Sequence, residues 1–445
     1  MGTISTLAHH MGFFTLINAP RDIHLIILLR CLRLSAFGAI SLILVKYLKS
    51  VGIEETQIGL LLTLTFIGEL IFSFILAHVS DRLGRRRIII LSSILMSVTG
   101  VLLYYFNSFW LLAIIMVIGI ITPSGTEVGP FRSIEQSAIS TLVKYEDRSD
   151  IFSWYTFSGG FSSGIGNFII GYSLDKSGSD YSICFAYYSA IGIVLALISC
   201  LLSDKVEVEK DTSVAKNLED DEASSSTPLL PSISPPKEKP NTLISYILPN
   251  FTEKSLNKLL LLTFLISLDS LGLSLSSKAW TVYYFTQRYL LDSASTGVLF
   301  GTASFIGAIS CLIGTYFCKK YGPIRTMITS HSIASVLLIF HSLPINYVSM
   351  SSIFLIRAFV RTMDLPSKHL FISAVVEPSE RTTAIGFINA AKTLVNTTGP
   401  IVSGYLASKD MLWLCFLIAG FLRLSYDFGL FIKFYGSREG ANAAQ

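Results

Sequence analysis

The sequence AHVSDRLGRRR, residues 77–87, separates two long apolar runs with a dense group of charges. Gly84 suits a tight turn between two helices, because glycine adopts backbone conformations closed to other residues. The charges around it can pair with neighbouring helix ends in one conformation and release them in another. They can also serve only to anchor a loop on the cytoplasmic side. The stretch therefore predicts a short loop between two helices, with either role open.

The rest of the chain is as apolar as these flanking runs. Of its 445 residues 51% are hydrophobic and 14% are charged, and its mean hydropathy is +0.60. A soluble domain has about a quarter charged residues, and a membrane-spanning helix needs about 20 apolar residues. Such runs cover 23–46, 58–80, 88–106, 110–136, 152–173, 183–203, 259–285, 296–318, 326–343, 348–373, 384–406 and 411–433.

These runs predict an all-α membrane protein with about twelve transmembrane helices. Strands of a β-barrel would instead alternate polar and apolar residues over about ten positions. Residues 204–258 are rich in serine, proline and charge, which is typical of a disordered linker. We therefore expect a first six-helix bundle over 23–203 and a second over 259–435, with tails at 1–22 and 436–445.

The two halves repeat one another at fixed offsets, as an internal duplication requires. The matching pairs are Gly59 with Gly297, Gly84 with Gly322, Gly166 with Gly399, and Gly171 with Gly404. The repeat predicts two pseudo-symmetric bundles.

Two parallel six-helix halves joined by a linker resemble the major facilitator superfamily. Residues 77–87 are similar to its GxxxDRxGRR motif, with Ala77 in place of the first glycine. The matching residues are Asp81, Arg82, Gly84, Arg85 and Arg86. The resemblance implies alternating access by two rocking bundles around a midplane site, with these five residues acting as a conformational switch.

Charged residues also occur inside the predicted spans, where each costs about 2.5 to 3.5 kcal/mol unless it faces a cavity or a partner. The resemblance implies that the first, fourth, seventh and tenth helices line a central cavity, and these helices hold most of the charges. Depth along the helices places three of them near the midplane. The candidates for substrate or proton binding are Arg33, Asp269 and Arg357, with Glu127 as a further proton carrier.

The tenth run, FLIRAFVRTMDLPSKHLFI at 354–372, carries a charged stripe. Positions 357, 361, 364 and 368 fall within about 60° of one another on a helix, and Pro366 is expected to kink it. We predict gate residues nearer the cytoplasm: Arg132, Arg361, Asp364 and Lys368. A structural ion pair is an equally good interpretation of each. Arg423 and Asp427 are interpreted as a structural pair, from their i to i+4 spacing.

Cations outnumber anions among these membrane charges, which favours a small polar or anionic organic solute. Protons are the expected coupling ion, because burial disfavours a charged carboxylate and lets it switch charge during a cycle. An electroneutral facilitator is the alternative within the same fold. The alternative from another class is a non-transporting membrane sensor or accessory protein.

No enzyme motif is present in the sequence: a P-loop, a metal-ligand cluster and a nucleophile elbow are all absent. The six cysteines form no CxxC pair, so neither a thiolate metal site nor a cofactor is expected. We expect no catalytic residues and no nucleic-acid partner. The predicted protein is a monomer in a lipid bilayer.

Lysine and arginine in the short loops predict that both termini are cytoplasmic. Within the linker, STPLLP follows an acidic EDDE and resembles a dileucine sorting signal. The expected location is the plasma membrane or the vacuolar or lysosomal membrane.

Overall fold

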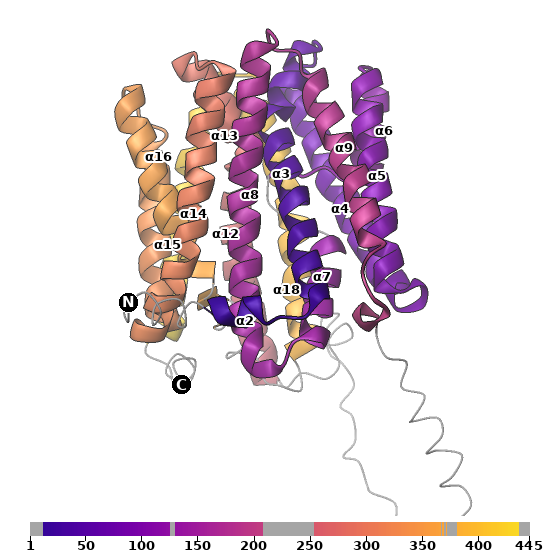
Figure 1. The fold of residues 1–445 in the computed structure, drawn as a ribbon. Coiled ribbons are helices and arrows are strands. Elements are labelled where there is room, and N and C mark those ends of the chain that lie inside the picture. Colours follow the sequence, from indigo (N-terminus) through magenta and orange to yellow (C-terminus); the bar gives the residue numbers. More distant parts are fainter. Residues whose placement is uncertain are drawn as a thin grey trace, which may run out of the picture.

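The computed structural model describes residues 12–124, 130–207, 253–365, 367–368, 371 and 381–435. Within these residues the regular structure is helical, and the long helices run side by side (Figure 1). Eight helical segments there are long and apolar enough to cross a membrane. Each predicted run coincides with one helix or with two successive helical pieces. The predicted all-α membrane fold is confirmed.

The first half begins with a short helix, α2, at the lower end of the molecule in Figure 1. We call this the α2 end. Most predicted runs of this half form one helix each, but the fourth run is divided between α6 and α7. The helices are α2 (Phe13–Ile17), α3 (Arg21–Ser50), α4 (Glu55–Leu83), α5 (Arg85–Tyr105), α6 (Phe109–Ile118), α7 (Pro130–Leu142), α8 (Arg148–Lys176) and α9 (Ser182–Ser199).

The second half repeats the long helices with more interruptions. Its seventh and eleventh runs are each divided into two helices. In its tenth run α16 ends at Arg361, and the described residues 364–365, 367–368 and 371 are again helical. The helices are α12 (Glu253–Leu275), α13 (Lys278–Tyr289), α14 (Ser293–Tyr321), α15 (Pro323–Phe340), α16 (Tyr347–Arg361), α18 (Arg381–Asn396), α19 (Thr398–Ala407) and α20 (Leu412–Phe434). The expected kink residue, Pro366, lies outside the described residues.

The seventh run is interrupted at Ser276 and Ser277, although its composition there stays apolar. Ser276 donates its hydroxyl to the Gly272 carbonyl at 2.9 Å, and Ser277 has extended backbone angles before α13 begins. The Ala279 amide then donates to the carbonyl of Pro123, in the segment after α6. Non-helical backbone at membrane depth is tolerated where it is buried in protein. This hydrogen bond therefore joins the interruptions of the fourth and seventh runs across the two halves.

The repeated glycines occupy equivalent places in the two halves. Gly84 has φ 89° and ψ 146°, and Gly322 has φ 85° and ψ 156°, each directly before the next helix. Positive φ favours glycine over residues with a Cβ atom. The turn predicted from residues 77–87 is thus built twice.

The same repeat makes a close contact between the bundles on each side. A Cβ atom on Gly171 would lie 2.7 Å from the Cα of Gly297, where α8 meets α14. A Cβ atom on Gly404 would likewise lie 2.7 Å from the Cα of Gly59, where α19 meets α4. Small residues let helix backbones approach this closely in a membrane.

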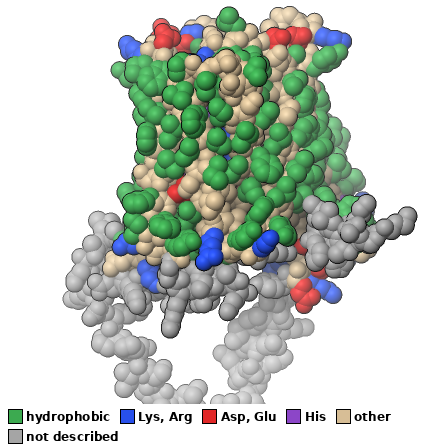
Figure 2. All heavy atoms as spheres, turned by 90° about the vertical axis from the view of Figure 1, so that its left-hand side faces the viewer, with side chains coloured by type: hydrophobic (Ala, Val, Ile, Leu, Met, Phe, Trp, Pro, Cys, Tyr) green, Lys and Arg blue, Asp and Glu red, His purple; other side chains and the backbone are tan. Residues whose placement is uncertain are grey.

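The outer surface is that of a membrane protein. Figure 2 shows one face on which hydrophobic side chains cover the middle, while charged side chains gather at the two ends. Large apolar side chains such as Trp110 and Phe428 are 75% and 65% exposed. An apolar band of this kind matches the hydrocarbon core of a bilayer.

Candidate transport site

In the first bundle the predicted residue Arg33 belongs to a buried ion pair. Its Nη2 donates to Glu135 Oε2 at 2.7 Å, and both side chains are 0% exposed. The Tyr155 hydroxyl donates to the same oxygen at 2.7 Å. The Arg33 guanidinium lies 4.2 Å from the centre of the Phe131 ring, and that of Arg30 lies 3.7 Å from the Tyr155 ring. We call Arg33, Glu135 and Tyr155 the first-bundle lock.

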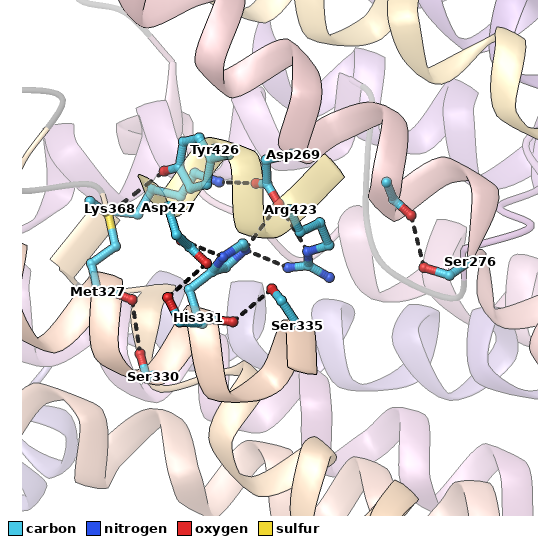
Figure 3. A network of polar contacts seen from close by, with 12 residues as sticks. Asp269, Ser276, Met327, Ser330, His331, Ser335, Lys368, Arg423, Tyr426 and Asp427 are labelled. Carbon is cyan, nitrogen blue, oxygen red and sulfur yellow. Dashed lines mark hydrogen bonds and ion pairs between the residues drawn. The ribbon is translucent and has the colours of Figure 1, made fainter. Parts of the chain in front are cut away.

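In the second bundle Asp269 of α12 is the centre of a larger network, drawn in Figure 3. Its Oδ2 accepts from the Lys368 ammonium at 2.5 Å. Its Oδ1 lies 3.1 Å from Arg423 Nε and 3.0 Å from His331 Nε2. Asp269, His331, Lys368, Arg423 and Asp427 are named the second-bundle network. The sequence prediction placed Asp269 with the substrate residues and Lys368 with the gate, and here they are in direct contact.

His331 of α15 is the member that the sequence did not single out. Its ring is 0% exposed. Nδ1 lies 2.8 Å from Asp427 Oδ1, and Arg423 Nη2 lies 2.7 Å from Nε2. The neighbouring Ser332 hydroxyl donates to the other oxygen of Asp427 at 3.1 Å. A histidine flanked by two serines in an apolar run, SHS at 330–332, is the signal that marks this position.

The predicted pair of Arg423 with Asp427 is wrong. Arg423 contacts Asp269 and His331, whereas Asp427 contacts His331 and Ser332. The i to i+4 spacing places both side chains on one face of α20. That face turns inward to α12 and α15, so partners on those helices replace the pair.

Arg357 of α16 is buried, at 7% exposure, among other cations. Arg361 and Arg423 lie within electrostatic range of it. Its Nε is buried without a hydrogen-bond acceptor among the described residues, and so are Nε and Nη1 of Arg423. The 3.1 Å contact of Arg423 Nε with Asp269 is thus an ion pair without hydrogen-bond alignment.

The remaining predicted gate residues lie around the same region. Asp364 is buried and within electrostatic range of Arg361. Lys392 of α18 is within electrostatic range of Lys368 and Asp269, and also of Arg132 in the first bundle. Arg132 therefore approaches the second-bundle network from the other half. Glu127 lies outside the described residues, and its role stays a prediction.

The motif loop holds the α2 end of the first bundle together. The backbone amides of Arg85 and Arg86 donate to the two carboxylate oxygens of Glu207, at 2.6 and 3.1 Å. A carboxylate at a helix N-terminus satisfies free amides and the helix dipole. The Arg85 guanidinium donates to Ser137 at 2.7 Å and to Thr141 at 3.0 Å, both in α7. The side chains of Asp81 and Arg82 are outside what the structure describes.

Polar contacts join the two bundles in the middle and toward the end opposite α2. Lys278 donates to Asn167 Oδ1 at 2.8 Å. The Tyr283 hydroxyl donates to Glu55 at 2.9 Å, and Thr63 donates to the carbonyl of Thr397 at 2.9 Å. With the two glycine contacts, these bonds hold the bundles together at that end.

Among the described residues, no group of three or more His, Cys, Asp and Glu side chains could hold a metal ion. What the described residues do bring together here is buried charge: ion pairs around Asp269 and Glu135, and a histidine between two carboxylates.

Comparison with known proteins agrees with this arrangement. The model of the Major Facilitator Superfamily matches residues 26–365. An uncharacterized membrane protein of Saccharomyces cerevisiae is 29% identical over 437 residues, covering 94% of this chain and 95% of that protein. The inward-open xylose transporter XylE of E. coli has a TM-score of 0.67 at 14% identity, covering 95% of this chain and 99% of its own.

A second solved structure has the same fold. A bacterial homolog of the human lysosomal transporter Spinster, inward-facing and unoccupied, has a TM-score of 0.61 at 14% identity. The match covers 95% of this chain and 97% of that one.

Proposed function

Because this chain belongs to the Major Facilitator Superfamily, a family of membrane transporters, we propose that it moves a small anionic organic solute by alternating access, coupled to protons. The observation that carries this proposal is Arg357. Its guanidinium is buried among cations, and its Nε has no hydrogen-bond acceptor among the residues that the structure describes.

A buried donor without a partner costs about 1 to 3 kcal/mol, and more when it is charged. Arg357 and Arg423 together contribute three such donors. The same region includes Arg361, whose charge adds to theirs. A ligand that brings oxygen acceptors and negative charge would satisfy these donors and offset the repulsion between the cations. An organic anion has both properties.

The contacts between the bundles support alternating access. The bonds from Lys278 to Asn167 and from Tyr283 to Glu55 join opposite halves and must break if that end opens. The glycine contacts beside them are close van der Waals contacts, so the helices that make them can separate. A midplane site can thus be uncovered from one end while the other end stays closed.

Proton coupling is supported by His331, whose ring lies between the carboxylates of Asp269 and Asp427. Histidine exchanges its proton near neutral pH more readily than other side chains. Its contact with Arg423 joins it to the cationic region around Arg357.

The test is uptake by the purified full-length chain in proteoliposomes with an imposed pH gradient. The panel contains monocarboxylates, dicarboxylates, organic phosphates, amino acids, sugars and nucleosides. We expect one anionic class to accumulate, and a protonophore to abolish the accumulation. Arg357→Ala should reduce uptake about a hundredfold, the effect of losing roughly 3 kcal/mol of binding, while the protein stays folded.

Arg325→Ala is the matched control, because Arg325 lies at the α2 end of α15 with its guanidinium 5.8 Å from the Tyr435 ring centre. It should transport like the wild type. Accumulation of a neutral solute with Arg357→Ala unchanged would contradict the proposal. Failure of every solute in the panel would favour the sensor alternative.

A further inference from the structure

We propose that His331 is a proton switch that exchanges Arg423 for Asp269 as the partner of its Nε2 atom. Protonation thereby releases Arg423 toward the cationic region around Arg357 and Arg361, which we call the anion site. The inference rests on the proposed function and names the residue pair through which proton and anion binding are coupled.

The neutral state follows from which atoms can donate. An arginine nitrogen can only donate a hydrogen bond, and Arg423 Nη2 lies 2.7 Å from His331 Nε2. Nε2 must therefore be unprotonated in this contact, and the ring proton is on Nδ1. Nδ1 then donates to Asp427 Oδ1 at 2.8 Å. Both ring nitrogens have a suitable partner in this tautomer.

The contact of Nε2 with Asp269 Oδ1, at 3.0 Å, is unsuited to this neutral state. Two acceptors face each other there, and the repulsion is offset by the cations Lys368 and Arg423 on the same carboxylate. A proton added to Nε2 turns this contact into a charge-assisted hydrogen bond without any movement of the ring.

The same proton makes the contact with Arg423 untenable. Two N–H groups would point at each other across 2.7 Å, one on each of two cations. Arg423 must leave Nε2, whereas Asp269 remains bound by Lys368 at 2.5 Å. One proton on His331 thus decides whether Arg423 or Asp269 is the partner of the ring.

Once released, the Arg423 guanidinium can bind an anion in the anion site. It lies within electrostatic range of Arg357 and Arg361. Among the described residues its Nη1 has no hydrogen-bond acceptor, and its Nε has only the unaligned ion pair with Asp269. An anion between these guanidiniums would take up the released donors. The proton adds one positive charge and a monoanion adds one negative charge, so the sum of charges in the membrane is unchanged. Proton and anion therefore favour each other's binding.

The charged and titratable groups around the ring come from several elements. The ring faces Asp269 of α12, and α20 contributes Arg423, Asp427 and Tyr426, whose ring centre is 5.2 Å away. The segment after α16 adds Lys368, through Asp269. α16 itself adds Arg357 and Arg361, through Arg423. In α14 the charged residues are Lys319 and Lys320, at its α2 end.

The experiment is nitrogen NMR of the full-length protein in nanodiscs, with all histidines labelled with nitrogen-15 and no transported solute added. His331→Gln assigns the signals by subtraction. In the wild type we expect Nε2 of His331 to be unprotonated at alkaline pH and to gain a proton on acidification. His341, whose Nδ1 lies 2.8 Å from the Leu337 carbonyl, is the internal control and should keep one tautomer.

Arg423→Met removes the donor that requires an unprotonated Nε2. We expect the unprotonated Nε2 form at alkaline pH to fall about tenfold, as the loss of one charge-assisted hydrogen bond implies. Arg423→Leu is a second variant in case the first does not fold. It also removes the guanidinium that donates to Nε2, so it should shift the ring proton to Nε2 in the same way.

A wild-type Nε2 that stays protonated at every pH would overturn the inference. So would tautomers left unchanged by both folded variants. If the switch is seen but the proteoliposomes move no anion, the proposed function fails and the switch stands. If anions are transported while His331 keeps one protonation state, only the switch fails.

Discussion

The two bundles both bury ions in the membrane, but they hold them differently. In the first-bundle lock, one carboxylate accepts from one arginine and one tyrosine, and the arginine lies against an aromatic ring. The second-bundle network instead shares Asp269 among three cationic or titratable groups, and two nitrogens of Arg423 have no hydrogen-bond acceptor in the described part of the chain.

The difference shows why one buried ion pair keeps its partners while another can exchange them on protonation. Arg33 and Glu135 contact each other directly, and no histidine lies between them among the described residues, so the lock has no imidazole that can exchange partners on protonation. His331 has a charged group against each ring nitrogen, and its two possible states choose different partners. We therefore assign stability to the lock and coupling to the network.

The largest effect is expected from Glu135→Ala, which breaks the lock. Arg33 would remain 0% exposed without its carboxylate, and removing one partner of a buried pair costs about 3 to 5 kcal/mol. Thermal unfolding of the purified protein in detergent should show a large loss of stability. The double variant Arg33→Met with Glu135→Met should recover most of it, because neither charge of the pair is then left without its partner. A single variant as stable as the wild type would remove the lock from the account.

The next largest effect is expected from substitutions of the glycines where the two bundles meet, and it shows whether the two glycine contacts are equivalent. Gly171→Leu and Gly404→Leu each place a side chain where the partner backbone lies 2.7 Å from a Cβ atom. Overpacking of this kind costs about 1 to 3 kcal/mol, and the two variants should lose similar amounts in the same unfolding measurement. A large loss in one variant only would show that the repeat is not used symmetrically.

His331→Gln acts on the second-bundle network and should change transport more than stability. Glutamine has no titratable nitrogen, so a pH gradient can no longer move Arg423. Accumulation of the transported anion should fall about tenfold, equivalent to roughly 1.4 kcal/mol of coupling. The unfolding temperature should change less than in Glu135→Ala. Accumulation equal to the wild type at every pH would separate His331 from proton coupling.

The smallest effect on stability is expected from Asp292, a charged residue outside the membrane. It is a reference for the first-bundle lock and the second-bundle network. Asp292 caps α14 by accepting from the Ser295 amide at 2.6 Å, and hydrogen bonds from Ser295 lower the pKa of its carboxyl. Its stabilisation is therefore present above the unfolded pKa, about 3.9, and is lost as pH falls through the lower folded value. Asp292→Ala should cost about 1 kcal/mol at neutral pH.

The control for this last prediction is Asp292→Asn, which keeps a side-chain acceptor but does not titrate in this range. It should retain most of the stability, and its unfolding should lack the acid-dependent contribution of the aspartate. An acid dependence as steep as that of the wild type would assign the effect to another group.

Much of the fold could be predicted because it depends on local composition. Long apolar runs locate the spans, and a repeated glycine locates the turns, as Gly84 and Gly322 show. The break before Lys278 could not be predicted, because Ser276 and Ser277 do not lower the apolar character of the run enough to mark it. Its partner, the Pro123 carbonyl, is contributed by the other half of the chain.

The candidate site was less predictable because partners are chosen in three dimensions. Depth along the helices predicted Arg33, Asp269 and Arg357 near the midplane. It did not show that Arg33 forms an ion pair with Glu135. The i to i+4 spacing of Arg423 and Asp427 gave the right face and the wrong partner. His331 was passed over because a neutral residue adds nothing to an inventory of charges, although two carboxylates converge on its ring.

The central claim is that the second bundle binds an anion and a proton together. It is tested most directly by following the pH of a weakly buffered solution of purified protein with an indicator dye, while adding the anion identified in the uptake panel. The wild type should take up about one proton for each monoanion bound, by the linkage between the two sites, and Arg357→Ala should take up none. Binding of the anion by the wild type without any proton uptake would contradict the account.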